Sequence, residues 1–214
     1  MSVSGEWDDE LSMYPLPMQP ELREAITTLS RKLQELHIIW QQYRQLYGEE
    51  SSAIDVLNRT AGLFFKIVQD ELWDSVLLGI CRMTDLAEHP KWNGRKNLTI
   101  WSLPPLIADE ELRGKLETLC KDAVKAAEPA REHRHKRIAH QDHGYTVDRK
   151  ANPLSGVSRA LVEDMLKTLR DVMKLVEGHY NGHDVLYEKF VDASGARVLV
   201  SKLRRLEHLI SSQD

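Results

Sequence analysis

The sequence has few cysteines and phenylalanines and lacks the long apolar stretches that mark membrane proteins. It contains two cysteines, three phenylalanines and no apolar stretch that approaches the length of a membrane span, for which about 20 consecutive residues are needed. The first ten residues, MSVSGEWDDE, are acidic and lack a hydrophobic run. These absences argue against an integral membrane protein and predict that no secretory signal or transit peptide is present. We therefore expect a cytoplasmic protein with no membrane partner.

The two cysteines are too few and too isolated to predict a disulfide framework. Cys81 and Cys120 both lie within apolar, helical patterns of sequence. Cysteine in such a pattern is typical of a small core residue rather than of a metal ligand. We expect two free thiols and a reducing compartment.

The chain also lacks an excess of positive charge. Its 214 residues include 33 acidic and 29 basic side chains, which gives a formal net charge of −4. Proteins that coat DNA or basic membrane-surface proteins have a positive overall balance, so any contact with a polyanion must be local. A composition of 42% hydrophobic and 29% charged residues is typical of a globular protein with one core.

What the sequence does contain is helical periodicity over most of its length. One helix is predicted from Pro20 to about Gly48 and a second, of about 35 residues, from Ser51 or Ser52. Further helices are predicted from about residue 109 with a kink or restart at Pro129, from Ser158 to Gly178 or Gly182, and over residues 198–210. Turns and one short helix are expected at 88–108, and irregular or weakly extended chain at 184–192.

These segments predict an all-α fold, an antiparallel four-helix bundle with additional short helices. Residues 1–20 contain Pro15, Pro17 and Pro20 and are expected to form a loose lead-in. The bundle is expected over residues 21–180 and a C-terminal helical extension over 181–214. The apolar face of the second helix is predicted to include Phe64, and Arg82 near its end is expected to pair with Asp85.

The least ordinary stretch is the polar run REHRHKRIAHQD at 131–142, close to the end of a predicted helix. Between 131 and 137, Glu132 is the only acidic residue among four fixed positive charges. Such closely spaced like charges repel, which predicts an anionic partner. Arginine binds phosphate with two nitrogens and histidine exchanges protons near neutral pH. The two residue types together suit cleavage of RNA without a metal ion.

The run carries a resemblance to a known superfamily. Arg134-His135-x-x-x-x-His140 resembles the R-x(4–6)-H signature of the HEPN superfamily (higher eukaryotes and prokaryotes nucleotide-binding). The longer string, from Arg134 through Ala139-His140-x-Asp142, is similar to the AbiU-like, abortive-infection branch. Three other strings also resemble that branch: Phe64-Phe65, Leu72-Trp73-Asp74 and Cys81-Arg82-Met83-Thr84-Asp85.

The resemblance implies a HEPN-type helical bundle and a composite site shared by two copies of the chain. It implies a metal-independent endoribonuclease that acts as a toxin or anti-phage effector, with RNA as substrate and no cofactor. A homodimer is expected, because one motif offers a single well-placed imidazole whereas the reaction requires two proton transfers. An antitoxin or another defence-system protein is a further expected partner.

The predicted catalytic residues are Arg134, His140 and His135. In the AbiU-like branch the position of His135 more often holds Asn or Asp, so phosphate contact, proton transfer and no role stay open for it. Asp142 is predicted to orient His140, with an Asx turn at the helix end as the alternative. The predicted RNA-binding residues are Arg131, Lys136 and Arg137, because phosphate contacts need only charge within reach.

Other interpretations of the run stay open. His133, His135, His140 and His143 could bind zinc, although their spacings do not provide the i,i+4 pair of a helical zinc site. The cations could instead form a solvated or ion-paired face near a helix C-terminus, where positive charge is favoured. A non-catalytic HEPN module that binds RNA, a nucleotide or a protein partner, and a dimeric scaffold without an anion site, are the remaining alternatives.

Overall fold

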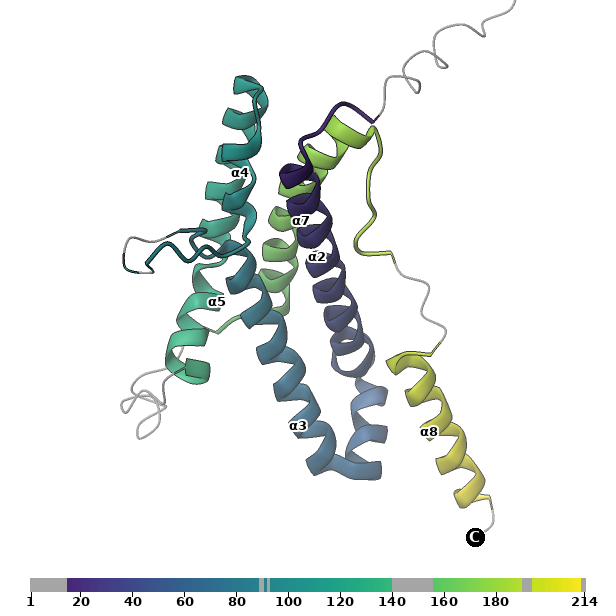
Figure 1. The fold of residues 1–214 in the computed structure, drawn as a ribbon. Coiled ribbons are helices and arrows are strands. Elements are labelled where there is room, and N and C mark those ends of the chain that lie inside the picture. Colours follow the sequence, from purple (N-terminus) through teal and green to yellow (C-terminus); the bar gives the residue numbers. More distant parts are fainter. Residues whose placement is uncertain (1–14, 89–90, 92, 140–155, 190–193, 213–214) are drawn as a thin grey trace, which may run out of the picture.

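The computed structural model describes residues 15–88, 91, 93–139, 156–189 and 194–212, with backbone alone for 137–139. Every regular element within these residues is a helix, apart from one isolated bridge between Glu88 and Lys96. The long helices are α2 (Pro20–Tyr47), α3 (Ser51–Thr84), α4 (Glu110–Ala126) and α7 (Arg159–Asn181). They pack side by side as a bundle (Figure 1), which confirms the all-α class.

Shorter elements complete the fold. The short 3-10 turns η2 (Ile100–Ser102) and η3 (Pro104–Leu106) replace the one short helix expected at 88–108. The short helix α5 (Glu128–His133) and the π-helical segment η4 (Arg134–Ala139) follow α4. The C-terminal helix α8 (Ala196–Ser211) lies beside the bundle (Figure 1). Within the described residues, no helix combines the length and the apolar composition that crossing a membrane requires.

Local sequence signals set the ends of the long helices. Pro20 occupies the first turn of α2, where its missing N–H is not needed, and the N–H of Gly48 bonds to Arg44 O at the other end. The Ser158 side chain accepts a hydrogen bond from the N–H of Leu161 and so caps α7. The same helix ends at Gly182, whose φ of 68° favours glycine. These boundaries agree with those predicted from the sequence.

The second long helix contains a kink that the sequence did not predict. Ala61 has φ −161° and ψ 65°, which are not helical values. A non-helical residue interrupts the regular rotation between successive side chains, so positions after Ala61 face other directions than a continuous helix would give them. Phe65 is therefore buried, whereas Phe64 is 59% exposed and Leu63 is 79% exposed. The expectation that Phe64 lies on the core face was wrong.

The core is built from leucine, isoleucine and valine side chains on the inner faces of the long helices. Its centre includes Leu29, Leu33, Leu77, Ile80, Leu116, Leu166, Leu169 and Val172, all with no exposed surface. Cys81 and Cys120 are free thiols within this core, as predicted. Burial raises the pKa of Cys81 to about 11 and that of Cys120 to about 12, so both are unreactive thiols at neutral pH.

Gly79 lets α2 and α3 approach closely. A Cβ atom there would overlap Cδ2 of the buried Leu36 side chain and lie 3.2 Å from its Cγ. Gly79→Ala is therefore expected to lower the free energy of unfolding by about 1–3 kcal/mol through overpacking. Gly114 is the matched control, since it is exposed in α4 with nothing within 4 Å of its Cβ position. Gly114→Ala is expected to raise the same quantity by about 0.5–1 kcal/mol.

Urea denaturation measures the free energy of unfolding of both variants and so tests whether Gly79→Ala lowers it while Gly114→Ala raises it. Equal effects at the two glycines would contradict the close approach of α2 and α3.

Tyr187 anchors the chain that follows α7. It has no exposed surface, its hydroxyl lies 2.7 Å from both carboxylate oxygens of Glu177, and Ser30 Oγ lies 2.8 Å from the same hydroxyl. Glu177 lies on α7 and Ser30 on α2. This segment was expected to be irregular, and the structure shows that it is nevertheless fixed to the bundle at one buried residue.

Candidate functional site

Pro129 determines where the polar run lies. α4 ends at Ala126, and α5 begins at Glu128 with Pro129 in its first turn, where a proline is tolerated because its N–H would be unpaired in any case. This is the restart that the sequence predicted. The new helix lies against the C-terminal end of α3 (Figure 1). The side chains of the polar run are therefore brought to the last residues of α3, which are far away in the sequence.

Arg134, the signature arginine, is held by Asp85. Its Nη1 donates a hydrogen bond of 2.7 Å to Asp85 Oδ2. Burial disfavours the charged guanidinium, but the hydrogen bond and the charge of Asp85 outweigh burial, so the pKa of Arg134 is raised. Arg134 thus carries a fixed positive charge with one defined contact, and its side chain is 21% exposed.

Arg131 is tied into the fold more extensively. Its Nη2 donates to the backbone oxygen and the hydroxyl of Thr84, at 2.9 and 2.8 Å. Its Nη1 donates to Val124 O at 2.8 Å and to Glu128 at 3.2 Å, and its Nε lies 3.7 Å from Asp85 Oδ1. These contacts satisfy a carbonyl in the last turn of α3. The geometry favours a structural role for Arg131 over the phosphate contact expected from the sequence.

The expected pair between Arg82 and Asp85 is replaced by these contacts. Both carboxylate oxygens of Asp85 face arginines from the polar run, while Arg82 is exposed. The local i,i+3 geometry was available, but the packing of α5 on α3 brings two other guanidinium groups to this carboxylate. Our expectation for Arg82 was wrong.

His133, to which the sequence assigned no role beyond a candidate zinc ligand, is buried against α3. Its Nε2 lies 2.9 Å from Asp74 Oδ1, and the imidazole is almost fully covered. A buried histidine beside a carboxylate fixes the rotation of α5 relative to α3. The signal that could have found this contact is Asp74 itself, which stands in one of the strings that resembles the AbiU-like branch.

Carboxylates within the chain offset much of the charge of the run. Lys136 Nζ donates to Glu132 at 2.7 Å. Arg134 donates to Asp85, and Arg131 donates to Glu128. The sequence predicted an anionic partner for the run and left an ion-paired face open. It did not identify Asp85, at the end of α3, as one of the carboxylates involved.

The signature segment after Arg134 has a wider helical form than expected. Residues Arg134–Ala139 form a π-helix, in which hydrogen bonds join residues five apart. Each residue there turns the chain through a smaller angle than in an α-helix, so side chains three or four positions apart do not align as they would on an α-helix. His135 is exposed and lines a surface depression of about 490 Å³ together with Glu128, Pro129, Arg131 and Glu132. Its position fits contact with a ligand from solvent.

The remaining predicted site residues fall outside what the structure describes. The backbone of Arg137 lies in η4, but its side chain lies outside the described residues, as do His140, Asp142 and His143. Of the predicted residues, Arg131 and Arg134 contact the end of α3, whereas His135 lines the depression beside α5 and Lys136 pairs with Glu132. Among the residues it describes, no three His, Cys, Asp or Glu side chains come together in a way that could hold a metal ion.

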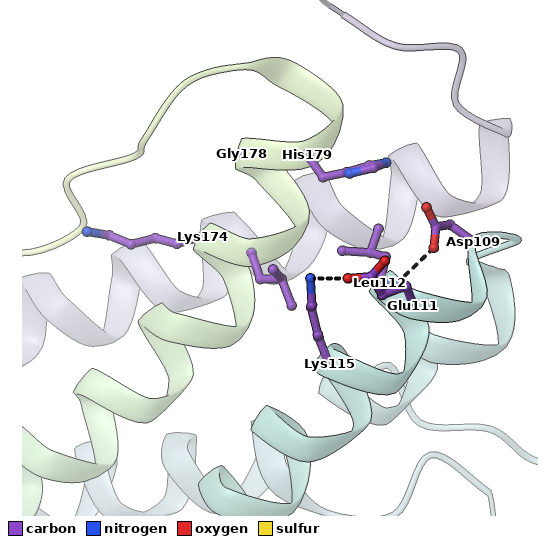
Figure 2. Close-up of a pocket in the computed structure, with 8 residues that line it drawn as sticks. Asp109, Glu111, Leu112, Lys115, Lys174, Gly178 and His179 are labelled. Carbon is purple, nitrogen blue, oxygen red and sulfur yellow. Dashed lines mark hydrogen bonds and ion pairs between the residues drawn. The ribbon is translucent and has the colours of Figure 1, made fainter.

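A second depression lies between the beginning of α4 and the end of α7 (Figure 2). It has a volume of about 500 Å³, and its lining includes Asp109, Lys115, Lys174 and His179. Figure 2 shows Lys115 paired with Glu111 one turn away on α4, and both residues line the depression. Asp109 caps α4 at the opposite end from the polar run. This depression contains none of the predicted site residues.

Comparison with known proteins agrees with the motif and the helical fold. The family model described as AbiU2, a HEPN family, matches residues 20–195. Neither a search of curated proteins nor a search of solved structures finds a significant match. The matched region covers all the long helices of the bundle and the whole polar run, and leaves out only the lead-in and α8. The chain therefore belongs to the AbiU2 family of HEPN proteins.

Proposed function

We propose that this protein is a metal-independent endoribonuclease that acts as a toxin or anti-phage effector. Arg134 and His140 would cleave RNA in a cleft between two copies of the chain. The observation that supports this proposal most directly is the exposure, charge and fixed contact of Arg134. Arg134 is partly exposed and permanently charged, one of its nitrogens is fixed by Asp85, and it lies six positions before His140.

The reaction would proceed by attack of a ribose 2′-oxygen on the adjacent phosphorus. A base removes the 2′-hydroxyl proton, the bond from phosphorus to the 5′-oxygen breaks, and an acid protonates that leaving oxygen. The products are a 2′,3′-cyclic phosphate and a free 5′-hydroxyl. His140 supplies one of the two proton transfers, and Arg134 stabilises the charge that grows on the phosphoryl oxygens. His135 is a second imidazole, accessible from solvent.

A second copy would supply the other imidazole, because a two-fold interface brings equivalent residues together. α3, the helix that ends immediately before Asp85, also exposes apolar side chains: Leu63, Phe64 and Ile67 are 79%, 59% and 54% exposed. Large exposed apolar clusters mark interaction surfaces on soluble proteins. These three residues support a homodimer that uses this part of α3.

Charged substitutions in this cluster are expected to weaken the dimer. Leu63→Glu and Ile67→Glu should each raise the dissociation constant about 30-fold, as truncation of an interface hot spot does, and cleavage should fall with the dimer fraction. Sedimentation velocity over a concentration series measures this. Leu186→Glu is the control, since Leu186 is 47% exposed on the chain after α7. Unchanged association in all three variants would remove the α3 surface from the proposal.

Incubation of the purified protein with labelled RNA in EDTA tests the proposed activity. We expect cleavage and 2′,3′-cyclic phosphate ends, and growth arrest when the protein is expressed in bacteria. RNA that is bound but not cleaved, with binding that weakens with salt and survives His140→Ala, would instead support the non-catalytic module. A dimer without RNA affinity would leave only a scaffold.

A further inference from the structure

We propose that Asp85 is a positioning residue for the reaction: it fixes the guanidinium of Arg134 so that its remaining N–H groups can take a phosphate. This inference rests on the proposed function. Asp85 lies 49 positions before Arg134 in the sequence and meets it only through the packing of α5 on α3.

The carboxylate of Asp85 is itself held in place. Asp85 follows the last residue of α3, and its N–H donates to Cys81 O at 2.8 Å. Oδ2 accepts from Arg134, whereas Oδ1 faces Nε of Arg131 at 3.7 Å. Arg131 in turn is bonded to Thr84 and Val124. The orientation of Arg134 is thus set by a series of contacts that begins in α3 and α4.

The contact with Asp85 uses only one side of the guanidinium. Arginine carries five N–H donors, and two of its nitrogens can bind one phosphate group together. Nη1 donates to Asp85, while Nε and Nη2 form no hydrogen bond with any residue that the structure describes. Asp85 therefore leaves a pair of nitrogens for phosphate while it restricts rotation of the group. A carboxylate that accepted hydrogen bonds from Nε and Nη2 instead would compete with the phosphate for these two nitrogens.

Orientation, rather than stability, is the property that this contact controls. Asp85 and Arg134 are both partly exposed, with side chains 30% and 21% accessible, and ion pairs with this degree of exposure contribute little to folding. A misplaced catalytic group, by contrast, can lower a rate by about 100-fold. The two effects can therefore be separated by experiment.

Asp85→Asn keeps the shape of the side chain and removes its charge. We expect kcat for RNA cleavage to fall by about 100-fold, with KM changed by less than about threefold and an unchanged melting temperature. Asp85→Glu, which keeps the carboxylate, should recover part of the rate. Asp171→Asn is the matched control, because Asp171 forms a partly exposed pair with Lys167 on α7, outside both the candidate site and the proposed dimer surface. Its kcat should equal that of the wild type.

A second comparison tests whether Asp85 acts through Arg134. In an Arg134→Lys background, Asp85→Asn should have no further effect on the rate, since residues that act as one unit are not additive. Wild-type kcat in Asp85→Asn, equal losses in both backgrounds, or a loss of rate that follows a lowered melting temperature would each overturn the inference. If the wild type itself does not cleave RNA, the proposed function fails first and this inference fails with it.

Discussion

His140→Ala and Arg134→Ala are each expected to reduce RNA cleavage by about 100- to 10,000-fold, the range that loss of a positioned acid or base produces. In the proposed reaction, removal of His140 leaves one proton transfer without a donor or acceptor at the phosphorus. Without Arg134 the charge on the phosphoryl oxygens has no fixed counter-charge. In bacteria, both substitutions should abolish the growth arrest that we expect from expression of the wild type.

The measurement is initial-rate cleavage of one labelled RNA in EDTA, with the melting temperature of each variant recorded beside it. Arg31→Ala and His208→Ala are the controls, because both side chains are exposed on helices outside the polar run, α2 and α8. Arg134→Ala removes one partner of a partly exposed ion pair, so its stability should fall by no more than about 1 kcal/mol. Full activity in either His140→Ala or Arg134→Ala would refute the assignment of that residue.

The ends of the long helices could be predicted because local chemistry determines them. Pro20, Gly48, Ser158 and Gly182 mark a start or a stop through a missing donor, a cap or a left-handed backbone. Each signal acts within one helical turn, so it can be recognised without knowledge of the fold. The restart at Pro129 belongs to the same class.

The kink at Ala61 could not be predicted in this way. Alanine has the highest intrinsic helix propensity, and no proline or glycine precedes it within the helix. Gly62 follows it, but a single glycine inside a helical pattern is usually tolerated. The π-helix at Arg134–Ala139 is a similar case, since its residues are ordinary helix formers. Local sequence signals therefore account for neither feature.

The carboxylates that contact the polar run could not be predicted from local sequence spacing either. Asp85 and Asp74 lie 49 and 59 positions from the residues that they contact. Sequence spacing identifies neighbours on one helix but not carboxylates on another. Only the resemblance of the strings around Asp74 and Asp85 to the AbiU-like branch indicated that these positions matter. The sequence left an ion-paired face open for these cations, but local spacing could not identify Asp85 as the carboxylate that faces Arg131 and Arg134.

A buried histidine outside the candidate site is expected to make the stability of the protein depend on pH. His37 on α2 is 4% exposed. Arg170 Nη1 lies 3.4 Å from its Nε2, and the ring of Tyr187 stacks on it at 6.3 Å. Burial first, and the charge of Arg170 second, lower the pKa of His37 to about 4, against weaker opposing effects of Glu188 and Glu163. The folded protein therefore holds this imidazole neutral.

The sign of the effect follows from the two pKa values. Above pH 6.5 the imidazole is neutral in both the folded and the unfolded chain, so its protonation does not affect stability. As the pH falls from 6.5 towards 4, the unfolded chain binds a proton that the folded chain does not, and the free energy of unfolding decreases. The difference between about 4 and 6.5 corresponds to roughly 3 kcal/mol. Burial raises the pKa of Glu177. As the pH falls, the folded chain therefore binds a proton at Glu177 before the unfolded chain does, which raises the free energy of unfolding over part of the same pH range.

Comparison of the wild type with His37→Gln isolates the contribution of His37, because Glu177 is present in both. We expect the free energy of unfolding of the wild type to fall by roughly 3 kcal/mol more than that of His37→Gln between pH 7 and pH 4. Urea denaturation at a series of pH values measures the difference. His208→Gln, in which an exposed histidine is replaced, should follow the wild type. Parallel pH curves for the wild type and His37→Gln would show that folding does not lower the pKa of His37.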